Sequence, residues 1–110
     1  MPKTRVKRET SGITAGSHNV FADLGFPNAD EMLAKAELLR QINRLIEKRG
    51  LTQVQAAKLL GIAQPNVSAL RNGRLSDFSL ERLIRFLVAL GQEVNIRVRP
   101  GRAGAGLRVA

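Results

Sequence analysis

Two carboxamide side chains, Gln64 and Asn66, stand near the start of an expected short helix. A carboxamide both donates and accepts a hydrogen bond, as the N6 and N7 atoms of adenine require. An α-helix fits the major groove of DNA, where the side chains near its N-terminus meet the base edges. Pro65 and Ala69 can contact only thymine methyl groups, so DNA shape is expected to contribute to recognition as well. If the helix lies in a major groove, the residues that could contact bases are Gln64, Pro65, Asn66, Ser68, Ala69 and Arg71.

The first of two helices that would position these residues is marked at both ends. Thr52, with Gln55 three positions later, forms a capping-box pattern, in which both side chains bind free backbone donors at a helix start. Gly61 can adopt the left-handed conformation that a helix end requires. These residues predict a helix over 53–60. Its apolar face is expected to contain Val54, Ala56, Ala57, Leu59 and Leu60.

A second helix is predicted over residues 64–72. Its inward residues, Val67 and Leu70, are spaced three apart, as one face of a helix requires. The two helices can cross closely only where the contact residue on the first is small, which gives Ala57 a physical role. Ala63 stands at the capping position and is a poor cap, so we expect the start of the second helix to be less rigid.

Two further helices flank this pair. Asn28, with Glu31 three positions later, predicts a long helix that ends near Lys48, and Ser79 opens another that Gly91 ends. The five residues ahead of Ser79 are expected to form a loop. We expect the four helices to pack orthogonally rather than as a parallel bundle. The core-facing residues are expected to be Met32, Leu33, Ala36, Leu39, Ile42, Leu45 and Ile46 in the first, and Leu80, Leu83, Ile84, Leu87 and Leu90 in the second.

After the last helix the apolar period changes from that of a helix to that of a strand. Val94, Ile96 and Val98 alternate with polar residues, and Pro100 follows. A repeat of two residues with one apolar face predicts a β-strand over residues 94–99. A lone strand leaves its backbone donors and acceptors unpaired, so this strand requires a partner.

The residues from Leu51 to Arg74 resemble the helix-turn-helix motif of the Cro/cI-type regulators, also called the xenobiotic-response-element (XRE) family. The resemblance covers residues 32–91. It implies a mainly α, lambda-repressor-like domain of four to five orthogonal helices that binds double-stranded DNA. The matching residues are Leu51, Thr52, Gln53, Ala57, Gly61, Val67, Leu70, Asn72, Gly73 and Arg74.

The same resemblance suggests which residues hold the phosphate backbone. Gln53 lies at the positive end of the first motif helix, and phosphate contacts of this kind position a protein on DNA. For Gln53 and Asn72, capping of a helix end is the alternative role. The residues expected to contact phosphates are Gln53, Asn72, Gly73 and Arg74.

Three partners are open to the predicted strand 94–99. They are the same strand of a second subunit, a strand of another protein, and a weak N-terminal strand near Ile13 or Val20–Phe21. We favour the homodimer, with Val94, Ile96 and Val98 at the interface, because helix-turn-helix proteins commonly bind half-sites as symmetric dimers. A disordered chain end is the remaining alternative.

Residues 20–100, taken in order, resemble a subgroup that includes the HigA-like antitoxins of type II toxin–antitoxin modules. This resemblance implies a protein that binds its own operator and masks a ribonuclease toxin of the RelE/HigB fold. Repressors without a toxin partner share the same core, so the antitoxin hypothesis and the free-standing repressor hypothesis both stay open. The N-terminal segment Val20 to Phe26 is apolar enough to dock on the domain or on a partner.

Composition agrees with a DNA-binding role. The chain has 110 residues, a net charge of +9 and no cysteine, and no apolar run approaches the ~20 residues of a membrane span. Residues 1–20 and 91–110 each contain four basic residues and one acidic residue, so the flanks can add to phosphate attraction. We expect a soluble, cytoplasmic protein with no cofactor and no metal.

Catalysis is disfavoured, because His18 is the single histidine and no carboxylates are spaced like metal ligands. Acidic residues such as Glu37 and Glu47 are expected to lie on solvated helix faces. The sequence therefore predicts a DNA-binding transcriptional regulator, a repressor that acts as a homodimer on a palindromic operator. A protein-interaction or RNA-binding module with the same fold is the alternative. The predicted organisation is a flexible basic arm (1–19), a DNA-binding domain (20–100, motif 52–73) and a flexible tail (101–110).

Overall fold

Helices account for all the regular secondary structure in the described part of the chain. The computed structural model describes residues 19–25, 28–101 and 106–109. These contain five α-helices, one 3-10 helix and no β-strand, which confirms the mainly helical prediction. The elements are α1 (Val20–Asp23), α2 (Ala29–Lys48), α3 (Gln53–Leu60), α4 (Gln64–Arg71), η1 (Leu75–Asp77) and α5 (Leu80–Ala89).

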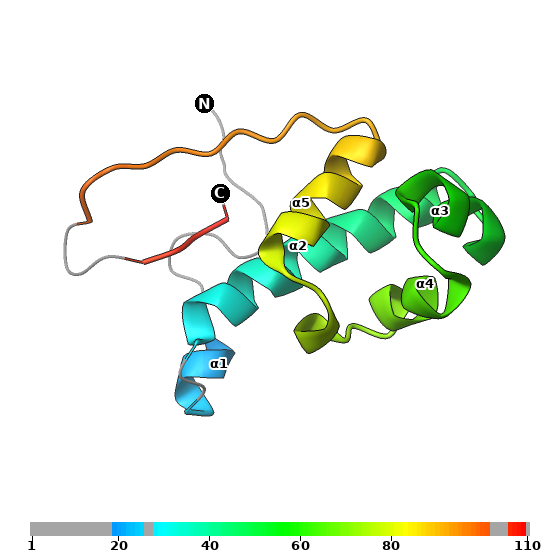
Figure 1. Ribbon diagram of the computed structural model, residues 1–110. Helices are drawn as coiled ribbons and strands as arrows, with labels where there is room; N and C mark the ends of the chain where they lie inside the picture. Colours follow the sequence, from blue (N-terminus) through cyan, green and yellow to red (C-terminus); the bar gives the residue numbers. More distant parts are fainter. Residues whose placement is uncertain (1–18, 26–27, 102–105, 110) are drawn as a thin grey trace.

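The long helix α2 is the central element (Figure 1). Helix α5 packs along it, α1 lies at its N-terminal end, and α3 and α4 lie together near its C-terminal end. Its inward residues recur at helical spacing, and Ile42 and Ile46 are 0% and 1% exposed. Burial of a side chain of this size contributes about 1.5–3 kcal/mol each. The rest of the core comprises Leu38, Leu39, Ala56, Leu60, Val67, Leu70, Phe78, Leu83, Phe86, Leu87 and Leu90.

Helix α3 buries a narrower face than its sequence predicts. Ala56 is fully buried and Leu60 nearly so, whereas Val54 is 51% exposed and Leu59 is 41% exposed. The core lies on one side of this eight-residue helix, so only a stripe of residues four apart is covered. Ala57, expected to allow the close crossing, is half-buried against the core, and Ala56 is the small residue at its centre.

The expected loop ahead of Ser79 contains a buried aromatic anchor. Residues 75–77 form η1, and Phe78 is 2% exposed. Its ring meets that of Phe86 edge to face, with centroids 6.0 Å apart and an interplanar angle of 76°. The guanidinium of Arg82 lies 5.3 Å and 5.5 Å from the two ring centroids, within the range of a cation–π contact. These contacts fix the connection between α4 and α5.

The strand expected over 94–99 does not form. These residues leave α5 as a long irregular segment (Figure 1), with Val94 half-buried against the core and Ile96 and Val98 75% and 91% exposed. The physical reason is the absence of a second strand among the described residues, because an isolated segment has no ladder partner.

The N-terminal candidate for such a partner is also not a strand. Val20–Phe21 belong to α1, whose start is capped by Asn19: its Oδ1 accepts from the backbone N–H groups of Phe21 (3.0 Å) and Ala22 (3.2 Å). The Nδ2 of the same side chain donates to Oδ1 of Asp30 at 3.2 Å and so joins α1 to α2. The other candidate, near Ile13, lies outside the described residues, as does Phe26.

The two chain ends are described only in part. Residues 1–18 of the expected arm, which include His18, lie outside the described residues, and so do 102–105 and 110 of the expected tail. Within the described tail, Val109 is half-buried against the core, and Leu107 lines a shallow depression at the start of α2. No helix of the described ranges is both long and apolar enough to cross a membrane.

Candidate nucleic-acid interface

The pairing of α3 with α4 is fixed by local hydrogen bonds at the ends of α3. The Thr52 Oγ1 accepts from the backbone N–H of Gln55 at 3.1 Å, and the Thr52 N–H donates to Gln55 Oε1 at 2.9 Å, so the predicted capping box is confirmed. At the other end Gly61 has φ 71° and ψ 34°, the left-handed conformation predicted for it. The N–H of Ile62 then donates to the carbonyl of Ala57 at 3.0 Å, which closes the turn.

The inner face of helix α4 is buried against the core, whereas its N-terminus has no side-chain cap. Val67 and Leu70 are both 0% exposed, as predicted. Asn43 of α2 donates its Nδ2 to the carbonyl of Leu70 at 2.9 Å and so ties the end of α4 to the central helix. Ala63 at the N-cap position is extended and makes no side-chain hydrogen bond, while Pro65 lies in the first turn. No side chain caps the start of α4, as predicted, so its orientation depends on the buried Val67 and Leu70 and on the Asn43 hydrogen bond.

The first turn of α4 displays its polar groups to solvent. Gln64, Pro65 and Asn66 are all exposed. Neither Gln64 nor Asn66 makes a side-chain hydrogen bond to any other described residue, so both carboxamides keep their donors and acceptors available for a ligand. Ala69, one turn further along, is half-buried. Residues 64, 65 and 66 therefore form the accessible start of α4, with Ala69 partly accessible one turn on, and the contact of all four with bases stays a prediction.

Two residues of the expected base-contacting set are engaged within the protein. Ser68 donates its Oγ to Oε1 of Gln53 at 3.3 Å, which joins α4 to the start of α3. Arg71 forms an ion pair with Glu47 of α2, with 3.7 Å between its Nη2 and Oε2. Helix α4 has eight residues and is about 12 Å long, so Arg71 lies well away from its first turn. The structure thus divides the six residues into four whose side chains have no polar partner among the described residues and two, Ser68 and Arg71, that have one.

The expected phosphate-contacting residues lie at two exposed helix ends. Thr52 and Gln55 supply the cap of α3, so the side chain of Gln53 is not needed for capping and meets Ser68 instead. After α4, Asn72, Gly73 and Arg74 are exposed. Gly73 has φ 74°, and the Arg74 N–H donates to the carbonyl of Ala69 at 3.1 Å, which turns the chain sharply away from the helix.

For Asn72, the alternative role of capping is carried by its backbone rather than by its side chain. Its N–H donates to the carbonyl of Ser68 at 2.9 Å, and its side chain makes no hydrogen bond to another described residue. The guanidinium of Arg74 forms no ion pair with a carboxylate of the described residues. Both side chains are available to an anion, and their phosphate contacts stay a prediction.

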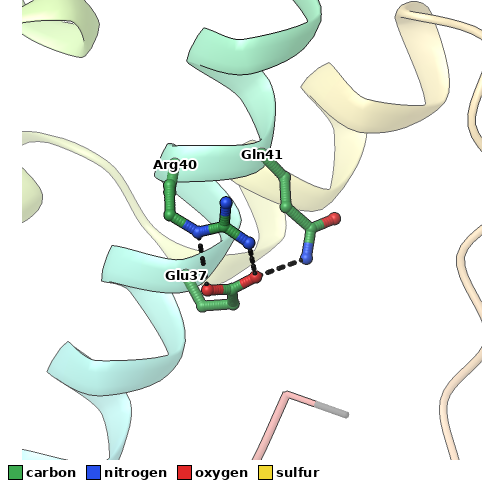
Figure 2. Close-up of polar contacts among 3 residues, drawn as sticks. All are labelled: Glu37, Arg40 and Gln41. Atoms are coloured by element: carbon green, nitrogen blue, oxygen red, sulfur yellow. Dashed lines mark hydrogen bonds and ion pairs between the residues drawn. The ribbon is translucent and has the colours of Figure 1, made fainter. Parts of the chain in front are cut away.

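A polar cluster around a buried carboxylate on α2 was not anticipated from the sequence. Glu37, expected on a solvated face, is 3% exposed, and that expectation was wrong. Its Oε1 accepts from Arg40 Nε at 3.0 Å, and its Oε2 accepts from Arg40 Nη2 at 2.7 Å and from Gln41 Nε2 at 2.8 Å (Figure 2). The hydrogen bonds to Glu37 raise the pKa of Arg40 above its ordinary value. The spacing of three and four residues was the available signal.

This cluster satisfies its own charges and has no accessible reacting group, so it stabilises α2 rather than forming a chemical site. Glu47, by contrast, lies on a solvated face as predicted, with its side chain 71% exposed. Among the described residues, no three His, Cys, Asp or Glu side chains come together in a metal-binding arrangement. The chemistry that the described surface can offer is hydrogen bonding and charge attraction around α3 and α4.

Comparisons with known proteins agree with this geometry. The model of a helix-turn-helix domain family matches residues 20–99. A protein of Mycobacterium tuberculosis provisionally named antitoxin HigA2 is 38% identical over 61 residues, which are 56% of this chain. The matched region spans 60% of the length of that relative. A solved structure provisionally named as an XRE family transcriptional regulator is 45% identical and superposes with a TM-score of 0.71, covering 76% of this chain and 98% of that one.

Proposed function

Because the chain belongs to the helix-turn-helix domain family, in its XRE-type and HigA-like branch, we propose that it is a repressor that reads a palindromic operator through α4. The family and the fold are those of DNA-binding transcriptional regulators. The finer assignment depends on one observation. The exposed first turn of α4 presents two unoccupied carboxamides, Gln64 and Asn66, on a helix whose inner face is fully buried.

The proposed binding mode places α4, which we call the recognition helix, in the major groove. Gln64 and Asn66 contact adenine edges, and Pro65 and Ala69 contact thymine methyl groups. Gln53 and Arg74 hold the backbone on either side, because they are exposed at the two ends of the α3–α4 unit. Only two of these base contacts are hydrogen bonds, so sequence-dependent DNA shape supplies part of the specificity.

Selection of bound sequences from random DNA tests this proposal. The full chain is incubated with a random duplex pool at a stated salt concentration, and the bound fraction is sequenced. We expect enriched half-sites in inverted orientation, with centres about one helical turn apart. A pool that shows no enrichment would refute the repressor assignment and would favour a protein-interaction or RNA-binding module.

A homodimer is the second part of the proposal. The apolar side chains of Ile96 and Val98 are largely exposed, on a segment that pairs with no strand among the described residues. A second copy of the chain would cover them. We expect a concentration-dependent dimer in sedimentation equilibrium, weakened by Ile96→Asp or Val98→Asp. Val54→Asp, an equally polar change on exposed α3, serves as the control. A monomer at all concentrations would refute this part.

An antitoxin role is the third part, and the similarity to the mycobacterial relative supports it. That protein carries the word antitoxin in its name, and this chain spans 60% of its length, so the activity comes to this chain only as a proposal. The proposed partner is a small ribonuclease of the RelE/HigB kind encoded in the neighbouring reading frame. Co-expression of the two proteins should restore the growth that the neighbour alone arrests. A neighbour without toxicity would leave a free-standing repressor.

A further inference from the structure

The positive charge of the recognition helix comes from one residue. Arg71 is the single charged residue of α4, whose sequence is QPNVSALR. Its guanidinium forms an ion pair with Glu47 in the C-terminal part of α2, with 3.7 Å between Nη2 and Oε2. Both side chains are accessible to solvent, 37% for Arg71 and 71% for Glu47. In the free protein, a carboxylate from the central helix therefore offsets the charge of the recognition helix.

This ion pair is loose. Its 3.7 Å separation exceeds the range of about 2.7–3.2 Å in which an N–H group donates a hydrogen bond to oxygen. In the same protein, Glu37 and Arg40 form a bidentate pair at 3.0 Å and 2.7 Å, with the carboxylate buried. Exposed pairs with a single long contact contribute little to stability and are screened by salt. The Glu47–Arg71 pair is therefore easily exchanged for a stronger one.

A DNA phosphate is such a competitor. A guanidinium donates two parallel hydrogen bonds to a phosphate, and charge-assisted bonds of this kind are stronger than a single distant ion pair. Arg71 lies in the last turn of α4, at the opposite end from Gln64 and Asn66, while the side chains near the N-terminus of a recognition helix meet the bases. This position suits the DNA backbone that borders the groove.

We infer that Glu47 holds Arg71 away from DNA in the free protein and that Arg71 leaves Glu47 for a phosphate when DNA binds. The inference rests on the proposed DNA-binding function. It moves Arg71 from the expected base-contacting residues to the phosphate-contacting ones, and it makes Glu47 a positioning residue that acts through Arg71. Because phosphates carry no sequence information, Glu47 lowers the affinity for all DNA sequences alike.

The experiment compares four variants on the selected operator and on random duplex DNA, by fluorescence anisotropy over a series of salt concentrations. They are Glu47→Gln, Arg71→Gln, the double variant, and Glu81→Gln. Glu81 pairs with Arg85 at 2.8 Å on the exposed face of α5, so its substitution removes the same charge outside the recognition helix and its ion pair. Thermal unfolding of each variant checks that the fold is unchanged.

We expect Glu47→Gln to bind both DNAs about two- to fivefold more tightly, which is the size of an exposed ion pair. Arg71→Gln should weaken both and flatten the plot of log K against log salt by about 0.9, the slope of one phosphate contact. In the Arg71→Gln background, Glu47→Gln should change the affinity by less than in the wild type. Glu81→Gln should bind like the wild type.

Several results would overturn the inference while leaving the proposed function intact. One is a result in which the wild-type chain binds the operator and Glu47→Gln binds it with the same or a lower affinity. Another is an equal gain with and without Arg71, which would mean that Glu47 simply repels DNA. A change confined to the operator would return Arg71 to the base contacts. A wild-type chain that binds no DNA would refute the proposed function itself, and the inference with it.

Discussion

Asn66→Ala is the sharpest test of base reading, because the structure separates its effect on DNA binding from its effect on folding. The Asn66 side chain is exposed and makes no hydrogen bond to another described residue. Its removal should therefore change the free energy of unfolding by less than about 0.5 kcal/mol. A bidentate carboxamide contact with adenine discriminates by ~1–3 kcal/mol, which corresponds to about 5- to 150-fold in the dissociation constant.

The assay is a pair of anisotropy titrations at one fixed salt concentration, with the selected operator and with random duplex DNA. We expect Asn66→Ala to lose this affinity on the operator and to keep nearly all of its affinity for random DNA, because base contacts are made only at the cognate site. Asn28→Ala is the matched control, since Asn28 is an exposed asparagine at the opposite end of α2 from α4 (Figure 1), and its side chain makes no cap hydrogen bond although the sequence predicted one. Equal losses on both DNAs would show that Asn66 does not read a base.

Three further predictions follow from the same contacts. Arg74→Ala should weaken operator and random DNA alike and flatten the salt dependence of log K by about 0.9; an unchanged slope would remove Arg74 from the phosphate contacts. Gly61→Ala should lower the free energy of unfolding by about 1–2 kcal/mol in urea, because φ is 71° while the added Cβ meets no atom within 4 Å; no change would contradict a conformational cost. Arg40→Ala should cost about 1–3 kcal/mol in the same assay, because it leaves the buried Glu37 carboxylate with Gln41 as its remaining side-chain donor, whereas Arg85→Ala at an exposed pair should cost less than about 1 kcal/mol. Equal costs for these two arginines would refute the role of burial.

The sequence predicted the parts of the fold that short-range chemistry determines. The capping box of Thr52 and Gln55, the left-handed Gly61 and the inward pair of Val67 and Leu70 all depend on neighbours within a few residues. Such local patterns have few alternative solutions, because each satisfies specific backbone donors or one helix face. The family resemblance depended on the same residues.

Features that depend on tertiary neighbours were not predicted. Phe78 lies in the connection between α4 and α5, and its buried ring contacts Phe86 and Arg82 of α5, which no periodic pattern predicts. Glu37 was predicted to be a surface carboxylate, because its burial depends on the packing of the folded chain around α2. The alternation in residues 94–99 predicted a strand with one apolar face, and that prediction was wrong, because a strand also requires a partner, which no single-chain pattern can supply.

The sequence predicted which residues at the start of α4 are exposed, but not which residues of the candidate interface have a partner within the protein. The exposed first turn of α4 follows from the placement of Val67 and Leu70 on the opposite face. The partners of Ser68 and Arg71 come from α3 and α2, and no sequence pattern indicated these pairings. Side chains on one recognition helix thus have different availabilities to DNA, although their spacing alone makes them look equivalent.

The start of α4 is restrained by a covalent ring where most helices use a hydrogen-bonding cap. Ala63 offers no side-chain oxygen, and Pro65 in the first turn has its φ angle fixed near −65° by its pyrrolidine ring. Water cannot displace this restraint, salt does not screen it, and it acts in the unfolded chain as well, where it reduces the conformational entropy to be lost. The proline ring thus restrains one φ angle in the turn that carries Gln64 and Asn66 without using either carboxamide.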